Sequence, residues 1–241
     1  MKKNIFIFCM LAITTAIISC DNATSTSDGY TQGLYTVDRN FLYPELVDTF
    51  FKVDNVSDFG LKTGDRTYLT RAYEVDNYYG MSMAKYHIKS VEEVLPVYGL
   101  TAIDDIDATK YTSPISEISL ILLNNYSAKA MWLWKKYQNI NVGYYSNGKE
   151  GDFKLSPIKL SGDTLCFALN AKIESGDKFM SQLLSFDISS ATNILPAEDA
   201  KKLAQLDSIH TKISILWHDE ITDSIKTMYP FGGKYKNYFK E

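Results

Sequence analysis

From Leu34 onward, the sequence is a series of short segments rich in aromatic and β-branched residues, separated by turn residues. Such side chains favour strands, whereas Gly, Asp, Asn and Ser favour the turns between them. Arg66–Tyr73 and Met81–Val91 also alternate along the chain, as half-buried strands do. Short strands at close spacing favour barrels and sandwiches over alternating strands and helices. The sequence therefore predicts an all-β fold.

The strand segments fall into two groups. The first lies between Leu34 and Val97 and suits a small closed barrel. Pro96 and the polar segment Asp104–Asp107 mark a break, after which a second group of strands runs to Trp217. We therefore expect a barrel at residues 31–110 and a β-sandwich at residues 111–241.

Two local patterns make more specific predictions. The pair Asn147-Gly148 follows a strand segment and is a strong signal for a hairpin turn. Pro196–Leu206 begins with proline, has acidic residues in its first turn and places leucines at helical spacing. It predicts a short helix in an otherwise β-rich chain.

The N-terminus has the organisation of a secretory signal. Lys2 and Lys3 precede an apolar run of 14 residues, Ile5–Ile18. At 1.5 Å per residue it would cover roughly 21 Å, short of the ~30 Å hydrocarbon core of a bilayer. It therefore predicts a removable signal and not a transmembrane helix. The four residues that end at Cys20 resemble a bacterial lipobox, in which the cysteine becomes acylated.

We therefore expect a lipoprotein signal peptide at residues 1–19, a lipid such as palmitate on Cys20, and a flexible tether at residues 20–30. An acylated Cys20 would hold the protein in the cell envelope, at the outer membrane, without fixing which face of that membrane it occupies. The membrane is thus one expected partner, contacted through the lipid anchor.

The composition of the mature chain argues against nucleic acid as a partner. Its 222 residues carry 23 lysines and arginines against 29 acidic residues, a net charge of −6, without a basic cluster. Only Cys166 remains after lipidation of Cys20, so neither an internal disulfide nor a thiolate metal site can form. We expect Cys166, between Leu165 and Phe167, to be a small core residue.

Motifs of catalysis and cofactor binding are absent from the sequence. It contains no H-E-x-x-H, G-x-S-x-G, P-loop or G-x-G-x-x-G pattern, and its three histidines lack metal-ligand spacing. We therefore expect no enzyme activity, no catalytic residue, no metal and no cofactor.

Aromatic residues are the more informative feature, with 17 tyrosines, 12 phenylalanines and 3 tryptophans. Exposed aromatic side chains near turns can stack on sugars or anchor a protein partner. The candidate binding surface comprises four tyrosines beside predicted turns: Tyr78, Tyr79, Tyr144 and Tyr145. The alternative is a role in the strands themselves, where tyrosine is common. Trp132 and Trp134, two residues apart, are expected in the sandwich core.

The order of these segments resembles the NigD-like lipoproteins of the Bacteroidetes. The resemblance rests on the lipobox and on five later segments: Gly64–Tyr73, Tyr86–Val91, Trp132–Trp134, Ile140–Tyr145 and Leu183–Ile188. It implies an N-terminal OB-like barrel (an OB-fold) and a C-terminal β-sandwich, and it carries no catalytic residues over to this chain. The segment Ala191–Ile209 is longer and more helical than the family pattern. The family takes its name from a bacteriocin-associated gene cluster.

These observations favour a lipid-anchored, non-enzymatic envelope protein that binds a partner in an accessory or immunity-like role. The alternative is a surface lipoprotein that binds carbohydrate. The partner would then be an envelope protein in the first case and a glycan in the second.

Overall fold

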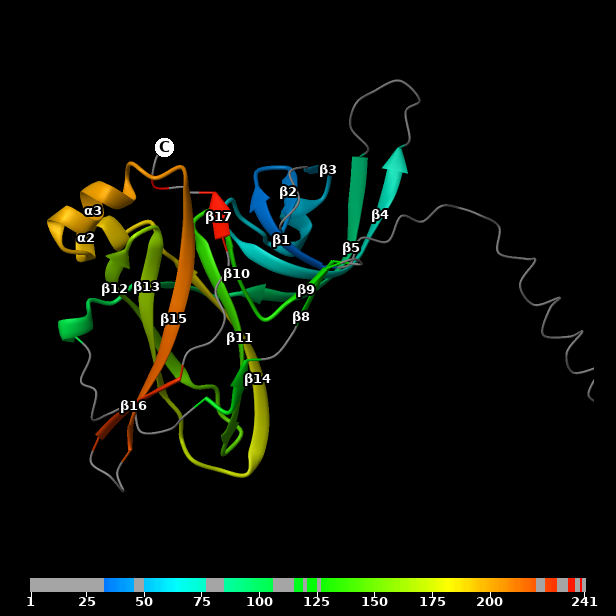
Figure 1. Ribbon diagram of the computed structural model, residues 1–241. Helices are drawn as coiled ribbons and strands as arrows, with labels where there is room; N and C mark the ends of the chain where they lie inside the picture. The colour runs from blue at the N-terminus through cyan, green and yellow to red at the C-terminus, as the bar shows by residue number, and fades with distance from the viewer. Residues whose placement is uncertain are drawn as a thin grey trace, which may run out of the picture.

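The computed structural model describes residues 33–45, 50–76, 85–105, 115–118, 121–124, 127–219, 224–228, 234–236 and 239. The expected signal peptide, Cys20, the tether, Tyr78 and Tyr79 lie outside these residues. Two β units lie side by side, a blue and cyan barrel and a larger green, yellow and orange sandwich (Figure 1). The all-β fold expected from the sequence is therefore confirmed. Within the described ranges, no helix is both long and apolar enough to cross a bilayer.

The first unit is a closed barrel. Its strands are β1 (Gly33–Asp38), β2 (Phe41–Pro44), β3 (Phe51–Val53), β4 (Arg66–Asp76) and β5 (Lys85–Leu95). They pair in the ring order β1-β2-β3-β5-β4, and β4 returns to β1. All pairs are antiparallel except β3–β5, and the short helix η1 (Val56–Phe59) joins β3 to β4. A five-stranded closed barrel is the OB-like arrangement that the family resemblance implies.

The second unit is a sandwich of two sheets. One sheet contains β10 (Met131–Trp134), β11 (Tyr137–Ser146), β14 (Lys178–Asp187) and β6 (Val97–Gly99), with β7 (Glu117–Ile118) beside β11. The other contains β12 (Asp152–Ser161), β13 (Thr164–Lys172), β15 (Ser208–Asp219) and β16 (Ser224–Met228), with β17 (Lys234–Lys236) beside β15. The pairs β13–β15 and β14–β6 are parallel.

Smaller elements complete the chain. Strands β8 (Ile121–Asn124) and β9 (Ser127–Lys129) form a two-stranded sheet near β1. Helix η2 (Ile103–Asp105) follows β6, and helices α2 (Ala191–Ile194) and α3 (Ala197–Leu203) connect β14 to β15. Pro196 directly precedes α3, so the helix predicted at 196–206 is confirmed.

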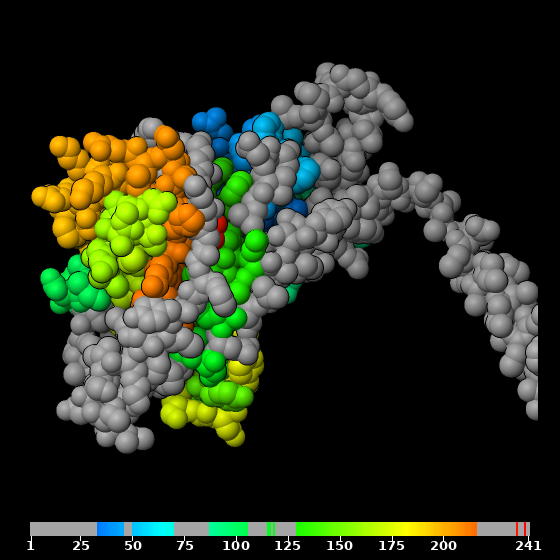
Figure 2. Space-filling view, viewed as in Figure 1, coloured from blue at the N-terminus to red at the C-terminus, as the bar shows by residue number. Residues whose placement is uncertain are grey.

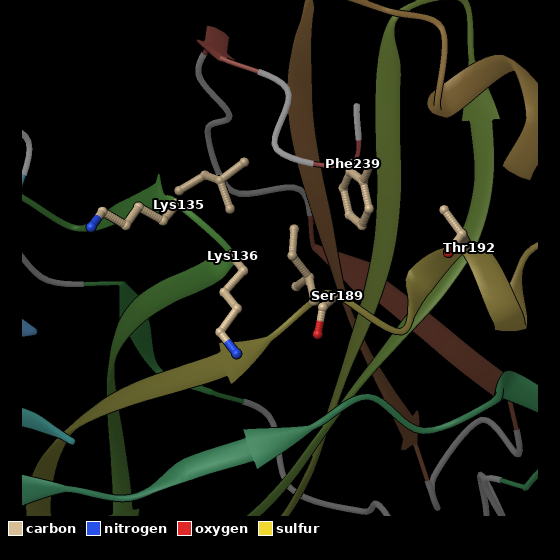
Figure 3. Close-up of a pocket in the computed structure, with 7 residues that line it drawn as sticks. Lys135, Lys136, Ser189, Thr192 and Phe239 are labelled. Carbon is tan, nitrogen blue, oxygen red and sulfur yellow. The ribbon is translucent and has the colours of Figure 1, made fainter. Parts of the chain in front are cut away.

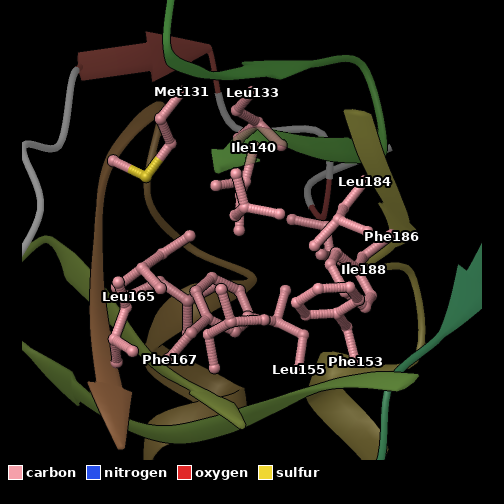
Figure 4. Close-up of a cluster of buried hydrophobic side chains, with 14 of the residues drawn as sticks. Met131, Leu133, Ile140, Phe153, Leu155, Leu165, Phe167, Leu184, Phe186 and Ile188 are labelled. Carbon is pink, nitrogen blue, oxygen red and sulfur yellow. The ribbon is translucent and has the colours of Figure 1, made fainter. Parts of the chain in front are cut away.

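The main hydrophobic core lies between the two sheets of the sandwich (Figure 4). Alternate residues of each strand point inward, so that Ile140 of β11, Leu155 of β12, Phe167 of β13 and Phe186 of β14 are all fully buried. Each buried side chain of this size contributes about 1.5–3 kcal/mol through removal from water. A smaller core inside the barrel contains Tyr35, Val37, Leu42, Val53, Leu69 and Ile88.

The expected boundary at residue 110 is wrong. Residues Val97–Gly99 form β6, which pairs with β14 inside the sandwich, with Val97 opposite Ser185. The chain therefore passes from the barrel to the sandwich at Pro96, directly after β5 ends. No linker separates the two units, because a single residue joins a barrel strand to a sandwich strand.

The predicted hairpin at Asn147-Gly148 is also wrong. The strands before and after this turn belong to different sheets, since β11 pairs with β14 and β12 pairs with β13. Gly148 has a positive φ of 96°, which glycine adopts readily. The turn therefore carries the chain from one sheet to the other.

Three expected core residues have other positions. Trp132 and Trp134 alternate with Met131 and Leu133, and it is Met131 and Leu133 that face the sandwich core. Trp132 instead lies fully buried in a cluster with Leu34 and Leu95 of the barrel. Cys166 is only partly buried, because its neighbours in β13 take the inward positions.

Candidate functional site

A buried ion pair lies where the barrel meets the sandwich. Arg66, the first residue of β4, and Glu45, directly after β2, both have fully buried side chains and pair with each other. The second carboxylate oxygen of Glu45 accepts a hydrogen bond of 2.8 Å from the indole Nε1 of Trp132 in β10. Burial raises the pKa of Glu45, while Arg66 and Trp132 oppose that rise. A buried charge is tolerated when it is paired and hydrogen-bonded, as both are here.

Arg66 also binds the sandwich directly. Its guanidinium donates hydrogen bonds to the Asn139 side chain of β11 and to the Ser185 hydroxyl of β14. Its central carbon lies 4.7 Å from the ring centroid of Tyr137. We call Glu45, Arg66, Trp132, Asn139 and Ser185 the junction core. The five residues are fully buried and join both β units, so they fix the position of the barrel on the sandwich.

The barrel also carries an aromatic cluster. Phe41 and Tyr43 of β2 lie on the face opposite the buried Leu42, and Phe50 is 39% exposed. The ring centroid of Phe50 lies 5.4 Å from that of Phe41 and 5.6 Å from that of Tyr43. The ammonium of Lys135, from the turn between β10 and β11 of the sandwich, lies 4.0 Å from the Tyr43 centroid. We call Phe41, Tyr43, Phe50 and Lys135 the aromatic–lysine surface.

The aromatic–lysine surface spans both β units. Its rings belong to the barrel and its ammonium to the sandwich, so the surface forms only when the two units hold their relative position. In the space-filling view, the blue and cyan atoms of the barrel adjoin the green atoms of the sandwich (Figure 2). The junction core fixes the relative position of the two units and therefore the distance between the aromatic rings and the Lys135 ammonium.

A pocket of about 240 Å³ lies beside this surface. We call it the hairpin pocket, because the β10–β11 turn forms one wall. It is lined by Leu133, Lys135, Lys136, Ile188, Ser189, Thr192 and Phe239. Figure 3 shows Lys135 extending away from Phe239, whereas Lys136 runs beside Ser189. The pocket thus combines three apolar side chains with two hydroxyl groups and two lysines, and the Lys135 ammonium points away from it.

The two lysines of the pocket are bound differently. The ammonium of Lys136 pairs with Asp187 at 2.7 Å. Burial tends to raise the pKa of Asp187, but hydrogen bonds from Lys136 and Ser189 outweigh it and hold that pKa below its ordinary value. Among the described residues, Lys135 forms no ion pair, and its ammonium has the Tyr43 ring as partner. The positive charge of Lys135 is therefore available to a ligand, while that of Lys136 is already neutralised.

The backbone of Lys135 has an unusual conformation. Trp134 and Tyr137 are paired, so Lys135 and Lys136 form a two-residue hairpin turn. Lys135 has a φ of 52°, a left-handed conformation that costs a residue with a side chain about 1 kcal/mol or more. Glycine is the favoured residue at such a position. The sequence instead keeps a long cationic side chain there, which directs the ammonium across the junction.

The expected tyrosine surface is only partly present. Tyr144 is fully buried; its hydroxyl donates to Gln182 at 2.8 Å and accepts from the Gly151 amide at 2.9 Å. It cannot contact a ligand at the surface, and its inclusion was wrong because adjacent strand residues face opposite sides of a sheet. Tyr145 is 54% exposed and packs edge-to-face against Phe179, with ring centroids 5.4 Å apart.

A histidine–carboxylate pair in the barrel has a structural role. His87 Nδ1 lies 2.8 Å from the Asp54 carboxylate, and Nε2 lies 3.2 Å from the Asn55 amide nitrogen. This pattern fits a neutral ring that donates to Asp54 and accepts from Asn55. The Asn55 side chain also exchanges two hydrogen bonds with the Ile88 backbone, which extends the β3–β5 pairing. In the part of the chain that the structure describes, no group of three His, Cys, Asp or Glu residues could hold a metal ion.

Sequence reasoning missed the junction core and the aromatic–lysine surface. The residues that Arg66 contacts in the junction core are 21, 73 and 119 positions away in sequence, so no local pattern connects them. One usable signal was present: Phe41-Leu42-Tyr43 alternates around a buried leucine. The other was Lys135-Lys136, which stands where a two-residue hairpin turn usually has glycine.

No family model matches the sequence, and no curated protein is similar to it. Solved structures do match. An uncharacterized protein from Parabacteroides merdae aligns over 86% of this chain and 98% of its own, at 10% identity and a TM-score of 0.55. A putative lipoprotein from Bacteroides fragilis aligns over 85% of this chain and 96% of its own, at 14% identity and a TM-score of 0.51.

A NigD-like immunity protein from Bacteroides caccae aligns over 86% of this chain and 95% of its own, at 15% identity and a TM-score of 0.47. At such low sequence identity, a structural match is evidence of a shared fold alone. The first two matches therefore indicate that the chain shares its all-β fold with solved proteins of Parabacteroides merdae and Bacteroides fragilis.

Proposed function

We propose that this chain is a lipid-anchored accessory protein of the bacterial envelope, and that it binds a protein partner through the aromatic–lysine surface. The proposal covers binding and not catalysis. One observation carries it: Phe41, Tyr43 and Phe50 cluster at the surface, and the Lys135 ammonium, which forms no ion pair with the described residues, lies over the Tyr43 ring. Aromatic side chains are enriched among the energetically important contacts at protein interfaces.

The proposed location at the outer membrane rests on the N-terminal sequence. An acylated Cys20 would anchor the protein, and the fold is shared with a putative lipoprotein of Bacteroides fragilis. Labelling cells with a clickable palmitate analogue tests the anchor. We expect label on the wild-type protein and none on Cys20→Ala; equal labelling of both, or of neither, would refute acylation at Cys20.

Capture of partners from intact envelopes tests the binding role. We would compare the wild-type chain with Phe50→Ala, because Phe50 is exposed and contacts both other rings. The matched control is Phe179→Ala, since Phe179 is an exposed phenylalanine at the far end of β14 from the junction. We expect a specific protein that wild type and Phe179→Ala capture and that Phe50→Ala loses. Equal capture by wild type and both variants would exclude the aromatic–lysine surface as the binding site.

A second candidate function is carbohydrate binding, favoured by the exposed Tyr145–Phe179 pair. Both rings lie on the outer side of the first sandwich sheet, opposite the buried Tyr144. Aromatic side chains at a surface can stack on sugar rings. A glycan array separates the two functions, because this role requires binding that Tyr145→Ala abolishes and Phe50→Ala leaves intact.

A further inference from the structure

We propose that the hairpin pocket and Lys135 together recognise an acidic peptide segment of the partner, with an apolar side chain in the pocket and a neighbouring carboxylate on Lys135. This inference rests on the proposed binding function and names the chemistry of its ligand. It draws on the size and lining of the pocket, on the charge state of its two lysines and on the hydrogen-bonding groups that remain free.

The pocket has the size and lining for one apolar side chain. Its volume of about 240 Å³ is below the range of about 300–1,000 Å³ of pockets for drug-sized ligands. Leu133, Ile188 and Phe239 supply apolar surface, and Phe239 is labelled among the lining side chains in Figure 3. A side chain such as leucine or phenylalanine would remove this apolar surface from water.

Charge at the rim favours an anionic neighbour for that side chain. Lys136 and Asp187 neutralise each other at 2.7 Å, whereas Lys135 forms no ion pair within the part of the chain that the structure describes. An ammonium has three donors and no acceptor, and the Tyr43 ring covers one side of it. A carboxylate that approaches from the free side would gain a charge-assisted hydrogen bond and keep the contact of Lys135 with Tyr43.

The same groups disfavour a glycan at this site. Sugar hydroxyls need acceptors as well as donors, and the carboxylate of the pocket region is already engaged. Asp187 accepts from Lys136 at 2.7 Å and from the Ser189 amide at 3.0 Å, and it also accepts from the Ser189 hydroxyl. Among the side chains that line the pocket, a hydroxyl-rich ligand would find acceptors only at the Ser189 and Thr192 hydroxyls. A peptide carboxylate presents acceptors alone and matches the free donors of Lys135.

The conformation of Lys135 supports the same assignment. Its φ of 52° would be relieved by glycine, yet the position holds a lysine whose ammonium crosses to the barrel. Strain of this kind persists where the surrounding structure holds it, and it gathers at binding sites.

Selection of a phage-displayed random dodecapeptide library on the detergent-solubilised full chain tests the proposal. We expect enrichment of sequences with a Leu, Phe or Trp next to Asp or Glu. Selected peptides, measured by fluorescence anisotropy, should bind Lys135→Glu at least about tenfold more weakly than wild type. The matched control, Lys159→Glu, makes the same charge change at an exposed position on β12, and it should leave affinity unchanged.

Several outcomes would overturn the inference. These are selected peptides without an acidic bias, equal binding to Lys135→Glu and wild type, or displacement of the peptides by polygalacturonate oligomers together with direct glycan binding. If the library yields no binder while envelope capture still depends on Phe50, the ligand class is wrong and the proposed function stands. If capture is also independent of Phe50, both are wrong.

Discussion

Replacing Arg66 with methionine gives the sharpest test of the junction core. Methionine fills much of the space of the arginine stem but removes the cation and its donors. Glu45 then keeps a fully buried carboxylate without a partner charge, and the Asn139 and Ser185 side chains each lose a donor. Removing one partner of a buried ion pair costs about 3–5 kcal/mol. Since whole domains are stable by about 5–15 kcal/mol, we expect a large fraction of the folding free energy to be lost.

The same variant should acquire a distinctive pH dependence. Burial already raises the pKa of Glu45, and Arg66 is the strongest opposing influence, so its removal raises that pKa further. A carboxyl with a higher pKa in the folded state than in the unfolded state takes up a proton on folding. Its contribution to stability is therefore present at low pH and is lost as the pH rises toward the folded-state pKa. As the pH rises from 5 to 8, the free energy of unfolding should therefore fall by more in Arg66→Met than in wild type.

Urea denaturation, followed by tryptophan fluorescence and by circular dichroism, provides the measurement, because Trp132 itself lies in the junction core. In wild type we expect the two signals to change together, since the barrel and the sandwich share buried contacts. The control is Arg66→Met combined with Glu45→Gln, which removes the titrating group and should remove the added pH dependence. Stability of Arg66→Met within about 0.5 kcal/mol of wild type would refute the reasoning.

Further predictions concern other parts of the fold. Phe167→Ala, in the sandwich core, should cost about 3–5 kcal/mol in urea denaturation, whereas the exposed Tyr145→Ala should stay within about 0.5 kcal/mol of wild type. Gly162→Ala meets no atom within 4 Å, yet its φ of 65° should cost about 1 kcal/mol in the same assay. The lowered pKa of Asp187 stabilises the fold above its unfolded-state pKa, so wild type should lose stability relative to Asp187→Asn as the pH falls below about 4 in urea titrations.

Many of the strands could be predicted from the sequence, because alternation and turn residues are patterns within short segments. The alternation of Arg66–Tyr73 and Met81–Val91 predicted strands that the structure has as β4 and β5. Strand β12 has a weaker local signal, because Pro157 lies in its middle and proline cannot donate to a sheet. In the structure, Pro157 lies at a register shift on a strand at the edge of its sheet, where the missing donor is tolerated.

The candidate site was less predictable than the fold. Counting tyrosines near turns could not tell Tyr144 from Tyr145, because burial depends on which side of β11 faces the second sheet. Trp132 was assigned to the wrong core for a similar reason: a third layer, the barrel, covers the outer side of its sheet. The contacts of Arg66 depend on how the two units pack, and that packing is set by many weak contacts distant in sequence.

The single residue between β5 and β6 has a consequence for how such a chain can evolve. Because β6 completes a sheet of the sandwich while it continues almost directly from a barrel strand, a break even a few residues away from Pro96 would remove part of one unit or the other. Recombination between related genes would therefore preserve both units only where the breakpoint falls at or beside the codon of Pro96.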